Sequence, residues 1–357
     1  MPTLWTSLMP HAPLPTAAAS YVPRVNSASE EIVKWLLADR SPVLLGGPTG
    51  VGKSTELNHA AQLLEPHRLV CLLPLDRWEN MRRLSAEQML RHIARRVALV
   101  ATDQQGLLLS PDLKRLLDRE GHGTSAPEFA RLVLTEVSRL SRKGKVTLLF
   151  DGLEKVPEGS TSTKLFDALA SLPEEVQLVA VIPYQAAFGP RAETILRPGE
   201  RFVSARALEV AGDPGRAGRA FLHDLLRSRV DEDVVARGHS EVVEEAAELS
   251  GGIPRTFLQL MADASTYAQH HQAAWPDPND LRLAVWDQVD TFRRLLLPGD
   301  ANAARSALGT DGRELNLGRK VRMMSHGILL ERLREHTPIL EMHPLARLAI
   351  DQGEAHA

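Results

Sequence analysis

Cysteine is almost absent from the sequence. The 357 residues include one, Cys71, inside the apolar run Leu69–Leu73. A disulfide within the chain is thereby excluded, and a lone cysteine in an apolar run indicates a buried thiol without a redox role. Net charge is nearly absent too, at −3 with a pI near 6.5. This balance gives no global attraction to nucleic acid or to anionic lipid.

Long apolar runs are also missing. No segment approaches the length of a membrane span, and the N-terminus lacks the basic region and apolar core of a signal peptide. We therefore expect a cytoplasmic protein without a membrane partner. The thirteen histidines show neither the H-E-x-x-H pattern nor pairing with cysteines, so no metal site is predicted beyond an ion carried by a nucleotide.

A glycine-rich loop is the strongest feature that is present. The pattern G-x-x-x-x-G-K-[ST] is matched by Gly47, Pro48, Thr49, Gly50, Val51, Gly52, Lys53, Ser54 and Thr55. An apolar run precedes the loop and an amphipathic stretch follows it, as a phosphate-binding loop requires. Lys53 would reach the β- and γ-phosphates, Ser54 would ligate Mg²⁺, and Thr55 would lie in the first turn of a helix whose N-terminus favours anions. A glycine-rich turn without a ligand is the alternative.

A second motif follows the apolar run Val146–Phe150 and places Asp151 and Glu154 after it. We expect Asp151 to end a buried strand next to the phosphate-loop strand and to hold Mg²⁺ through water, while Glu154 polarises the water that attacks the γ-phosphate. The alternative is that both are surface acids at the end of a strand. This alternative has more weight for Glu154, because the sequence does not show where its side chain points.

The order of the apolar runs predicts the domains. Residues 1–20 are rich in proline and are expected to form a disordered tail. Residues 21–207 alternate apolar runs with amphipathic stretches, which predicts an α/β core with a parallel five-stranded sheet. Residues 208–275 read as helices only, a helical lid. Residues 276–357 end in a helix and two short strands, the order of a winged-helix-like module.

Two segments resemble a known family. Asp151-Gly152-Leu153-Glu154-Lys155 resembles the D-G-h-[DE]-[EK] segment of STAND-type signalling ATPases, where h is apolar. Ser250-Gly251-Gly252-Ile253-Pro254-Arg255 is similar to the G-x-P-R of their helical lid, which the origin-recognition (Orc/Cdc6-like) branch of AAA+ ATPases shares. The resemblance covers residues 21–275.

This resemblance implies roles for four further residues. Pro254 would contact the nucleotide, and Arg255 would sense the γ-phosphate. The segment before the first core helix would cover the adenine through Val22 and Arg24. The alternative for Arg255 is an exposed arginine in a helix-to-helix turn. The alternative for Val22 and Arg24 is ordinary packing of an N-terminal extension.

Two features of that family are less clear in this sequence. Only Tyr184 or Gln185 could serve as the polar sensor after the fourth strand, which favours slow hydrolysis. An arginine finger for a neighbouring subunit would be sought among Arg191, Arg197 and Arg201, and the sequence does not select one of them.

The C-terminal region is locally basic at Arg319, Lys320 and Arg322. A DNA-reading helix shows such a cluster, and so do a solvated face and a protein-docking surface. The segment His343-Pro344-Leu345 resembles the end of winged-helix modules, where the histidine commonly has a packing role.

The predicted function is an ATP-binding and ATP-hydrolysing switch that uses Mg²⁺ and passes its nucleotide state to a separate partner protein. Assembly with copies of itself would accompany ATP binding. ATP is favoured over GTP because the N-K-x-D motif does not occur. The alternatives are a DNA-associated AAA+ ATPase, a small-molecule P-loop kinase, and a module that holds ATP without turnover.

Overall fold

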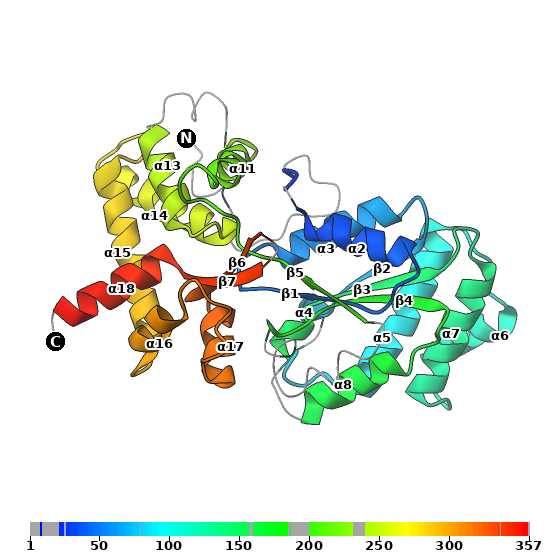
Figure 1. The fold of residues 1–357 in the computed structure, drawn as a ribbon. Helices are drawn as coiled ribbons and strands as arrows, with labels where there is room; N and C mark the ends of the chain where they lie inside the picture. The colour runs from blue at the N-terminus through cyan, green and yellow to red at the C-terminus, as the bar shows by residue number, and fades with distance from the viewer. Residues whose placement is uncertain are drawn as a thin grey trace. The chain divides into compact units, whose positions relative to one another are not determined.

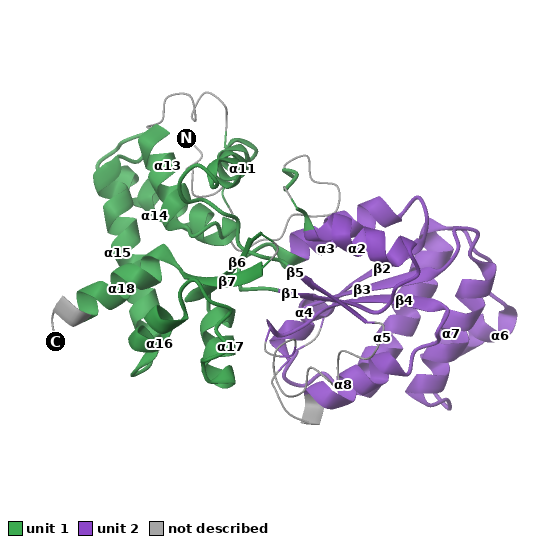
Figure 2. Ribbon diagram, in the orientation of Figure 1, with its two compact units in different colours: residues 1–27, 47–53, 205–357 green, residues 28–46, 54–204 purple. Residues whose placement is uncertain are grey.

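The computed structural model describes residues 8, 21–24, 26–78, 80–156, 160–184, 186, 200–230, 240–335 and 337–355. The chain forms two compact units, which Figure 2 shows in different colours. Unit 1 contains residues 1–27, 47–53 and 205–357, and unit 2 contains residues 28–46 and 54–204. The phosphate-loop sequence is therefore divided, because its residues up to Lys53 belong to unit 1 and Ser54 belongs to unit 2. The expected tail lies outside the described residues, apart from Leu8.

Unit 2 alternates strands and helices. Its elements in chain order are α2 (Ala28–Leu37), β1 (Val43–Gly46), α3 (Lys53–Leu64, which starts on the last loop residue), β2 (Leu69–Pro74), α4 (Leu75–Trp78), α5 (Ala86–Leu99), the π-helix η1 (Val100–Gln104), α6 (Pro111–Asp118), α7 (Ala126–Leu140), β3 (Val146–Asp151), the 3-10 helix η2 (Leu153–Lys155), α8 (Ser160–Ala170), β4 (Val176–Val181) and β5 (Arg201–Ser204). Helix α5 begins with a capping box, in which the Ser85 and Gln88 side chains each bond to the backbone of the other residue.

The strands of unit 2 form one parallel sheet in the order β2-β3-β4-β1-β5. Helices α2 and α3 cover one face, and α5, α7 and α8 cover the other (Figure 1). Burial on both faces explains why β3 is apolar apart from Thr147 and the terminal Asp151 and has no exposed residue. The predicted five-stranded parallel sheet is confirmed.

The position of Asp151 within this sheet was predicted incorrectly in one respect. β3 pairs with β2 and β4, whereas β1 pairs with β4 and β5, so the acidic strand is not next to the phosphate-loop strand. β4 lies between them because its apolar residues pair with both neighbours, for example Val179 with Val43 and with Leu149. The order of strands along the chain does not determine their order in the sheet.

Cys71 lies on β2 and its side chain is fully buried. Burial raises the pKa of its thiol to about 12, and the nearby Arg96 guanidinium offsets this only in part. The thiol is therefore protonated at neutral pH, which confirms the prediction of a buried strand thiol.

Unit 1 is mainly helical. Its elements are α11 (Arg216–Arg227), α13 (Ser240–Leu249), α14 (Pro254–His270), α15 (Pro278–Leu295), α16 (Asp300–Ala307), α17 (Leu317–Ser325), the antiparallel strands β6 (Leu329–Arg334) and β7 (Thr337–Met342), and α18 (Pro344–Ala355). The core between α11, α13, α14 and α15 includes Leu222, Val242, Phe257 and Leu281, each at most 1% exposed. In the described residues of 208–275 the regular elements are helices, and α17 is followed by two strands, as expected, whereas α16 was not predicted.

His343 precedes α18 and confirms the expected packing role. Its side chain is fully buried, and the centroid of its ring lies 4.8 Å from that of Phe292. The Leu345 amide donates a hydrogen bond to Nδ1 at 3.2 Å. Burial, helped by the positive charge of Arg332, lowers the pKa of His343 to about 3, so the ring is neutral at physiological pH.

We predict that this histidine makes stability depend on pH. The unfolded chain binds the proton below its ordinary pKa of 6.5, whereas the folded chain binds it only near 3. Stability is therefore full above pH 6.5 and falls by about 1.4 kcal/mol per pH unit as the pH drops from 6.5 towards 3. Urea unfolding of wild type at pH 7.5, 6 and 5 measures the slope, and His343→Gln should remove this part of it.

His271 supplies the matched control for that experiment. The carboxylate of Asp280 raises the pKa of this exposed histidine, so its contribution has the opposite sign and is lost as the pH rises through the folded value. His271→Gln should leave the acid-side slope in place. An equal slope in wild type and His343→Gln would contradict the assignment.

Candidate functional site

The phosphate loop follows β1 and departs from regular backbone conformation. Gly47, Gly50 and Gly52 all have positive φ angles, of 152°, 87° and 101°. Two features exclude a side chain at Gly50. Its positive φ disfavours any other residue, and an added Cβ would lie 2.9 Å from Cβ of Arg255. The loop residues predicted from the glycine pattern therefore adopt the bent path that this pattern requires.

Lys53 folds back over this loop. Its Nζ donates hydrogen bonds to the carbonyl oxygens of Gly47 at 2.9 Å and Pro48 at 3.0 Å. The ammonium group is thus held at the loop by neutral acceptors. A phosphate oxygen would be a stronger acceptor because it is charged.

Two other segments of unit 1 bond to the backbone of the loop. The Arg255 amide donates to the Gly50 carbonyl at 3.3 Å, which places the start of α14 against the loop. The Ser325 carbonyl at the end of α17 accepts from the Thr49 amide at 3.4 Å and from its hydroxyl at 3.3 Å. The sequence motif gave no sign of Ser325, because its contact uses a main-chain carbonyl.

The N-terminal segment also reaches the loop. Arg24 Nη1 donates to the Val51 carbonyl at 3.1 Å, and Nη2 donates to the Arg206 carbonyl. Val22 is half-buried two residues earlier. Unit 1 therefore brings together four of the predicted elements: Arg24, the loop, Pro254 and Arg255.

Ser54 and Asp151 come together in unit 2. Asp151 ends β3 with 8% of its surface exposed, and its carboxylate accepts hydrogen bonds from the Ser54 hydroxyl and from the Gly152 amide at 3.1 Å. Burial raises the pKa of Asp151, the Ser54 hydrogen bond opposes this, and the Asp76 carboxylate adds to it. A hydroxyl and a carboxylate oxygen in contact fit the oxygen ligands that Mg²⁺ prefers, and a cation there would favour the ionised acid.

Sequence reasoning missed Asp76 and the role of Lys155 beside this pair. Asp76 follows β2, and its Oδ2 forms an ion pair with Nζ of Lys155 in η2. Within the described residues the buried Asp76 Oδ1 has no hydrogen-bond partner. Glu154 also lies in η2 and is half-buried. A carboxylate directly after an apolar strand was the signal that could have identified Asp76.

Of the two residues considered as the polar sensor, Tyr184 is buried against the end of β1, where a Cβ added to Gly46 would lie 3.3 Å from its Cδ2. Gln185, Arg191 and Arg197 lie outside the described residues. Arg201 begins β5, and its guanidinium carbon lies 4.6 Å from the centroid of the Trp35 ring, a cation–π arrangement.

The three cations proposed for DNA reading all contact other residues of unit 1. Arg322 donates to the Leu295 carbonyl at 3.0 Å and pairs with Asp300, which is fully buried. Arg319 lies 3.4 Å from the same carboxylate, and Lys320 donates to the Asp311 carbonyl. These contacts explain the basic cluster by the folding of α16 and α17.

We predict that Arg322→Ala destabilises the protein. Removing one partner of a buried ion pair leaves an uncompensated carboxylate, and Arg319 with the Leu297 amide would compensate Asp300 only in part. The free energy of unfolding should fall by about 3 kcal/mol, measured by urea titration. Arg313→Ala is the control, because its side chain is 89% exposed and pairs on the surface, and should give no measurable change. Unchanged stability in Arg322→Ala together with lost DNA binding would contradict this structural role.

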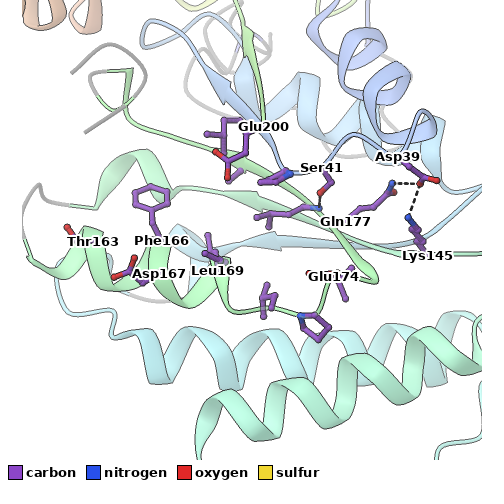
Figure 3. Close-up of a pocket in the computed structure, with 18 of the residues that line it drawn as sticks. Asp39, Ser41, Lys145, Thr163, Phe166, Asp167, Leu169, Glu174, Gln177 and Glu200 are labelled. Atoms are coloured by element: carbon purple, nitrogen blue, oxygen red, sulfur yellow. Dashed lines mark hydrogen bonds and ion pairs between the residues drawn. The ribbon is translucent and has the colours of Figure 1, made fainter. Parts of the chain in front are cut away.

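A cavity of about 500 Å³ opens in unit 2 (Figure 3). Its walls include Leu44, Phe166 and Leu178, and at its rim Asp39 pairs with Lys145 at 3.1 Å. Gln177 and Lys145 lie at the beginnings of β4 and β3, at the edge of the sheet opposite Asp151. The cavity therefore takes no part in the site built around Asp151.

The sheet order, the loop after β1 and the helical region after β5 define an α/β P-loop fold. No family model and no curated protein matches the chain. Solved structures with similarity include the Aeropyrum pernix Orc1 protein in complex with DNA, at 18% identity, TM-score 0.48 and coverage of 99% of this chain and 96% of that one. Cdc6p from Pyrobaculum aerophilum is 16% identical, with TM-score 0.47 and coverage of 94% and 96%.

The Thermotoga maritima RuvB Holliday junction branch migration motor is 13% identical, with TM-score 0.43 and coverage of 91% and 94%. At such identities similarity bears on fold alone, so function is argued below from the residues of the site. In the part of the chain that the structure describes, no helix has the length and apolar character needed to cross a bilayer.

Proposed function

We propose that the protein is a nucleotide-controlled switch that binds ATP with Mg²⁺ and hydrolyses it slowly. The observation that carries this proposal is the hydrogen bond between Ser54 and Asp151. It joins the last part of the phosphate-loop motif to the acid at the end of the apolar strand. These are the two protein oxygens that would hold a nucleotide-bound Mg²⁺.

The remaining roles follow from the chemistry of the side chains. Lys53 would leave the loop carbonyls and neutralise charge on the β- and γ-phosphates. Bound Mg²⁺ supplies further neutralisation of the developing charge. Glu154 would position the attacking water and accept its proton, and Lys155 with Asp76 would fix the turn that carries Glu154.

The switch would act through the contacts of the loop. Phosphate oxygens bind the loop amides, so a nucleotide competes with the Ser325 carbonyl for the Thr49 amide. Arg255, whose amide already bonds to Gly50, would extend its side chain to the γ-phosphate. Hydrolysis removes that phosphate and so changes how the start of α14 and the end of α17 engage the loop.

The proposed organisation assigns a part of the chain to each step. Residues 21–207 form the ATPase core, 208–275 the helical lid and 276–357 a winged-helix-like module, preceded by the tail 1–20. Val22, Arg24 and Pro254 would contact the nucleotide. The output would pass to a separate effector protein in the cytoplasm, or to further copies of this chain. DNA reading is not proposed, because Arg319, Lys320 and Arg322 make contacts within unit 1.

We predict different effects for Lys53→Ala and Glu154→Gln. Loss of the Lys53 ammonium removes a charge-assisted interaction with phosphate and should weaken ATP binding at least tenfold, measured by calorimetry. Glu154→Gln should keep ATP binding but lower phosphate release about 100-fold or more, since a general base contributes on that order. In light scattering, the Glu154→Gln protein with ATP should hold the larger species that wild type forms transiently.

Lys114→Ala and Glu175→Gln make the same two substitutions at exposed positions of unit 2 and should behave as wild type. The central proposal fails if wild type binds no nucleotide, or if Lys53→Ala binds ATP as tightly as wild type. Binding without turnover in wild type would leave a module that only holds ATP.

A further inference from the structure

The turn between α13 and α14, residues 250–255, carries the Arg255 amide that bonds to the loop. It is internally bonded: the Ser250 hydroxyl donates to the Ala247 carbonyl at 2.6 Å, and the Gly252 amide donates to Ser250 Oγ at 3.1 Å. The Leu208 amide bonds to the Gly252 carbonyl at 3.0 Å. The turn is thereby tied to the segment that follows β5.

Arg332 on β6 bridges the same two segments. It is 6% exposed, and its Nη2 donates to the Gly251 carbonyl at 2.8 Å while Nη1 donates to the Leu208 carbonyl. Its Nε lies 3.4 Å from Oε2 of Glu341, which balances part of the buried charge. The planar guanidinium thus holds two carbonyl groups, from positions far apart in the chain, in one fixed geometry.

Strand β6 also shapes the space that receives the turn. Leu330 and Arg332 lie two residues apart and therefore on one face of the hairpin. Gly251 has a φ of 58°, and an added Cβ would lie 2.9 Å from Cδ1 of Leu330 and 3.0 Å from Cδ2 of His343. Leu330 packs with Ile253 in a small buried cluster. The turn is therefore enclosed by the hairpin on the Gly251 side.

The other end of the turn touches the phosphate loop. The Arg255 amide bonds to the Gly50 carbonyl, and a Cβ on Gly50 would lie 2.9 Å from Cβ of Arg255 and 3.2 Å from Cγ2 of Ile253. Three residues separate Gly251 from Arg255. Because this stretch of backbone is short, a displacement of the Gly251 carbonyl should be transmitted to Arg255 and so to the phosphate loop.

We propose that Arg332 is a positioning residue that fixes the turn 250–255, and thereby sets where Arg255 stands relative to the phosphate loop. This inference rests on the proposed role of Arg255 as the residue that distinguishes ATP from ADP. The hairpin β6–β7 is then the part of the C-terminal region through which nucleotide recognition is tuned. An aliphatic side chain of similar volume would fill the space but would not hold the two carbonyls.

The test is a double-mutant cycle read by the ratio of ATP affinity to ADP affinity. Arg255→Ala should lower ATP affinity about tenfold and leave ADP affinity within about twofold. Arg332→Lys keeps the positive charge and the aliphatic part of the side chain but loses the planar guanidinium that bonds to two carbonyls. It should shift the ratio of ATP affinity to ADP affinity by about fivefold. Because Arg332 acts through Arg255, adding Arg332→Lys to Arg255→Ala should change the ratio no further.

A purely structural role predicts another result. Loss of stability alone would weaken ATP and ADP binding equally, leave the ratio unchanged, and overturn the inference. Arg334→Lys, on the same strand with a 75% exposed side chain, is the matched control and should match wild type. Thermal melts establish that each variant is folded, and if Arg332→Lys is not, Arg332→Gln replaces it in the cycle.

The remaining outcomes separate this inference from the proposed function. If Arg255→Ala shifts the ratio and Arg332→Lys does not, only the role of Arg332 is wrong. Fully additive effects in the double variant also overturn it, because Arg332 would then act independently of Arg255. If Arg255→Ala leaves the ratio unchanged, the sensor role of Arg255 fails and the inference fails with it.

Discussion

The backbone of the phosphate loop satisfies its own hydrogen bonds only in part, and other segments of unit 1 supply further partners. Three glycines with positive φ keep residues 47–52 from forming a helix or strand, and the Val51 amide bonds to the Pro48 carbonyl within the loop at 3.5 Å, so other amides and carbonyls take partners from elsewhere. Arg255 bonds to Gly50, Arg24 to Val51, and Ser325 to Thr49. These partners come from the N-terminal segment, the turn before α14 and the end of α17. A short loop thereby draws three distant parts of the sequence into one unit.

Buried charges in the protein are compensated to different degrees. Arg332 donates to two carbonyls and lies near two glutamates, and Asp300 is paired with Arg322 and bonded to the Leu297 amide. Among the described residues, the hydrogen bonds to the Asp151 carboxylate come from the Ser54 hydroxyl and the Gly152 amide, and burial raises its pKa. The hydrogen-bond donors to Asp151 are therefore neutral. Asp300, by contrast, pairs with two arginines, Arg322 and Arg319, which supports a role for it in folding.

The sequence predicted the elements well and their spatial relations less well. Apolar runs ending in loops or acids identified β1 to β4, because strands inside a parallel sheet are mainly apolar, whereas β5 was predicted from a short segment in which Phe202 and Val203 are the apolar residues. The same runs could not reveal that β4 separates β3 from β1, since pairing depends on long-range contacts that no local pattern encodes.

Contacts through main-chain atoms were likewise hidden from the sequence. Ser325 contacts Thr49 through its carbonyl, which every residue type possesses. The apolar pattern of α16 is too short to predict a helix. The basic cluster on α17 shows the converse limit. Its charges were visible in the sequence, but Asp300, which pairs with Arg319 and Arg322, lies some twenty residues earlier. Composition identified the cations without their partners.

The loop contacts also set an upper limit on the free energy by which nucleotide binding can be coupled to the C-terminal region. A nucleotide that takes the loop amides and Lys53 would replace the bonds to Ser325 and to the Gly47 and Pro48 carbonyls. Each is worth about 1 kcal/mol net, and the Ser325 bonds at 3.3 and 3.4 Å are long. Within the described residues, the hydrogen bonds from the loop to α17 are those to Ser325, so their loss accounts for about 1 kcal/mol of coupling, or roughly fivefold in affinity. A switch with a larger response must therefore also move the turn 250–255, whose packing against Gly50 and bonds to Arg332 involve more of the structure.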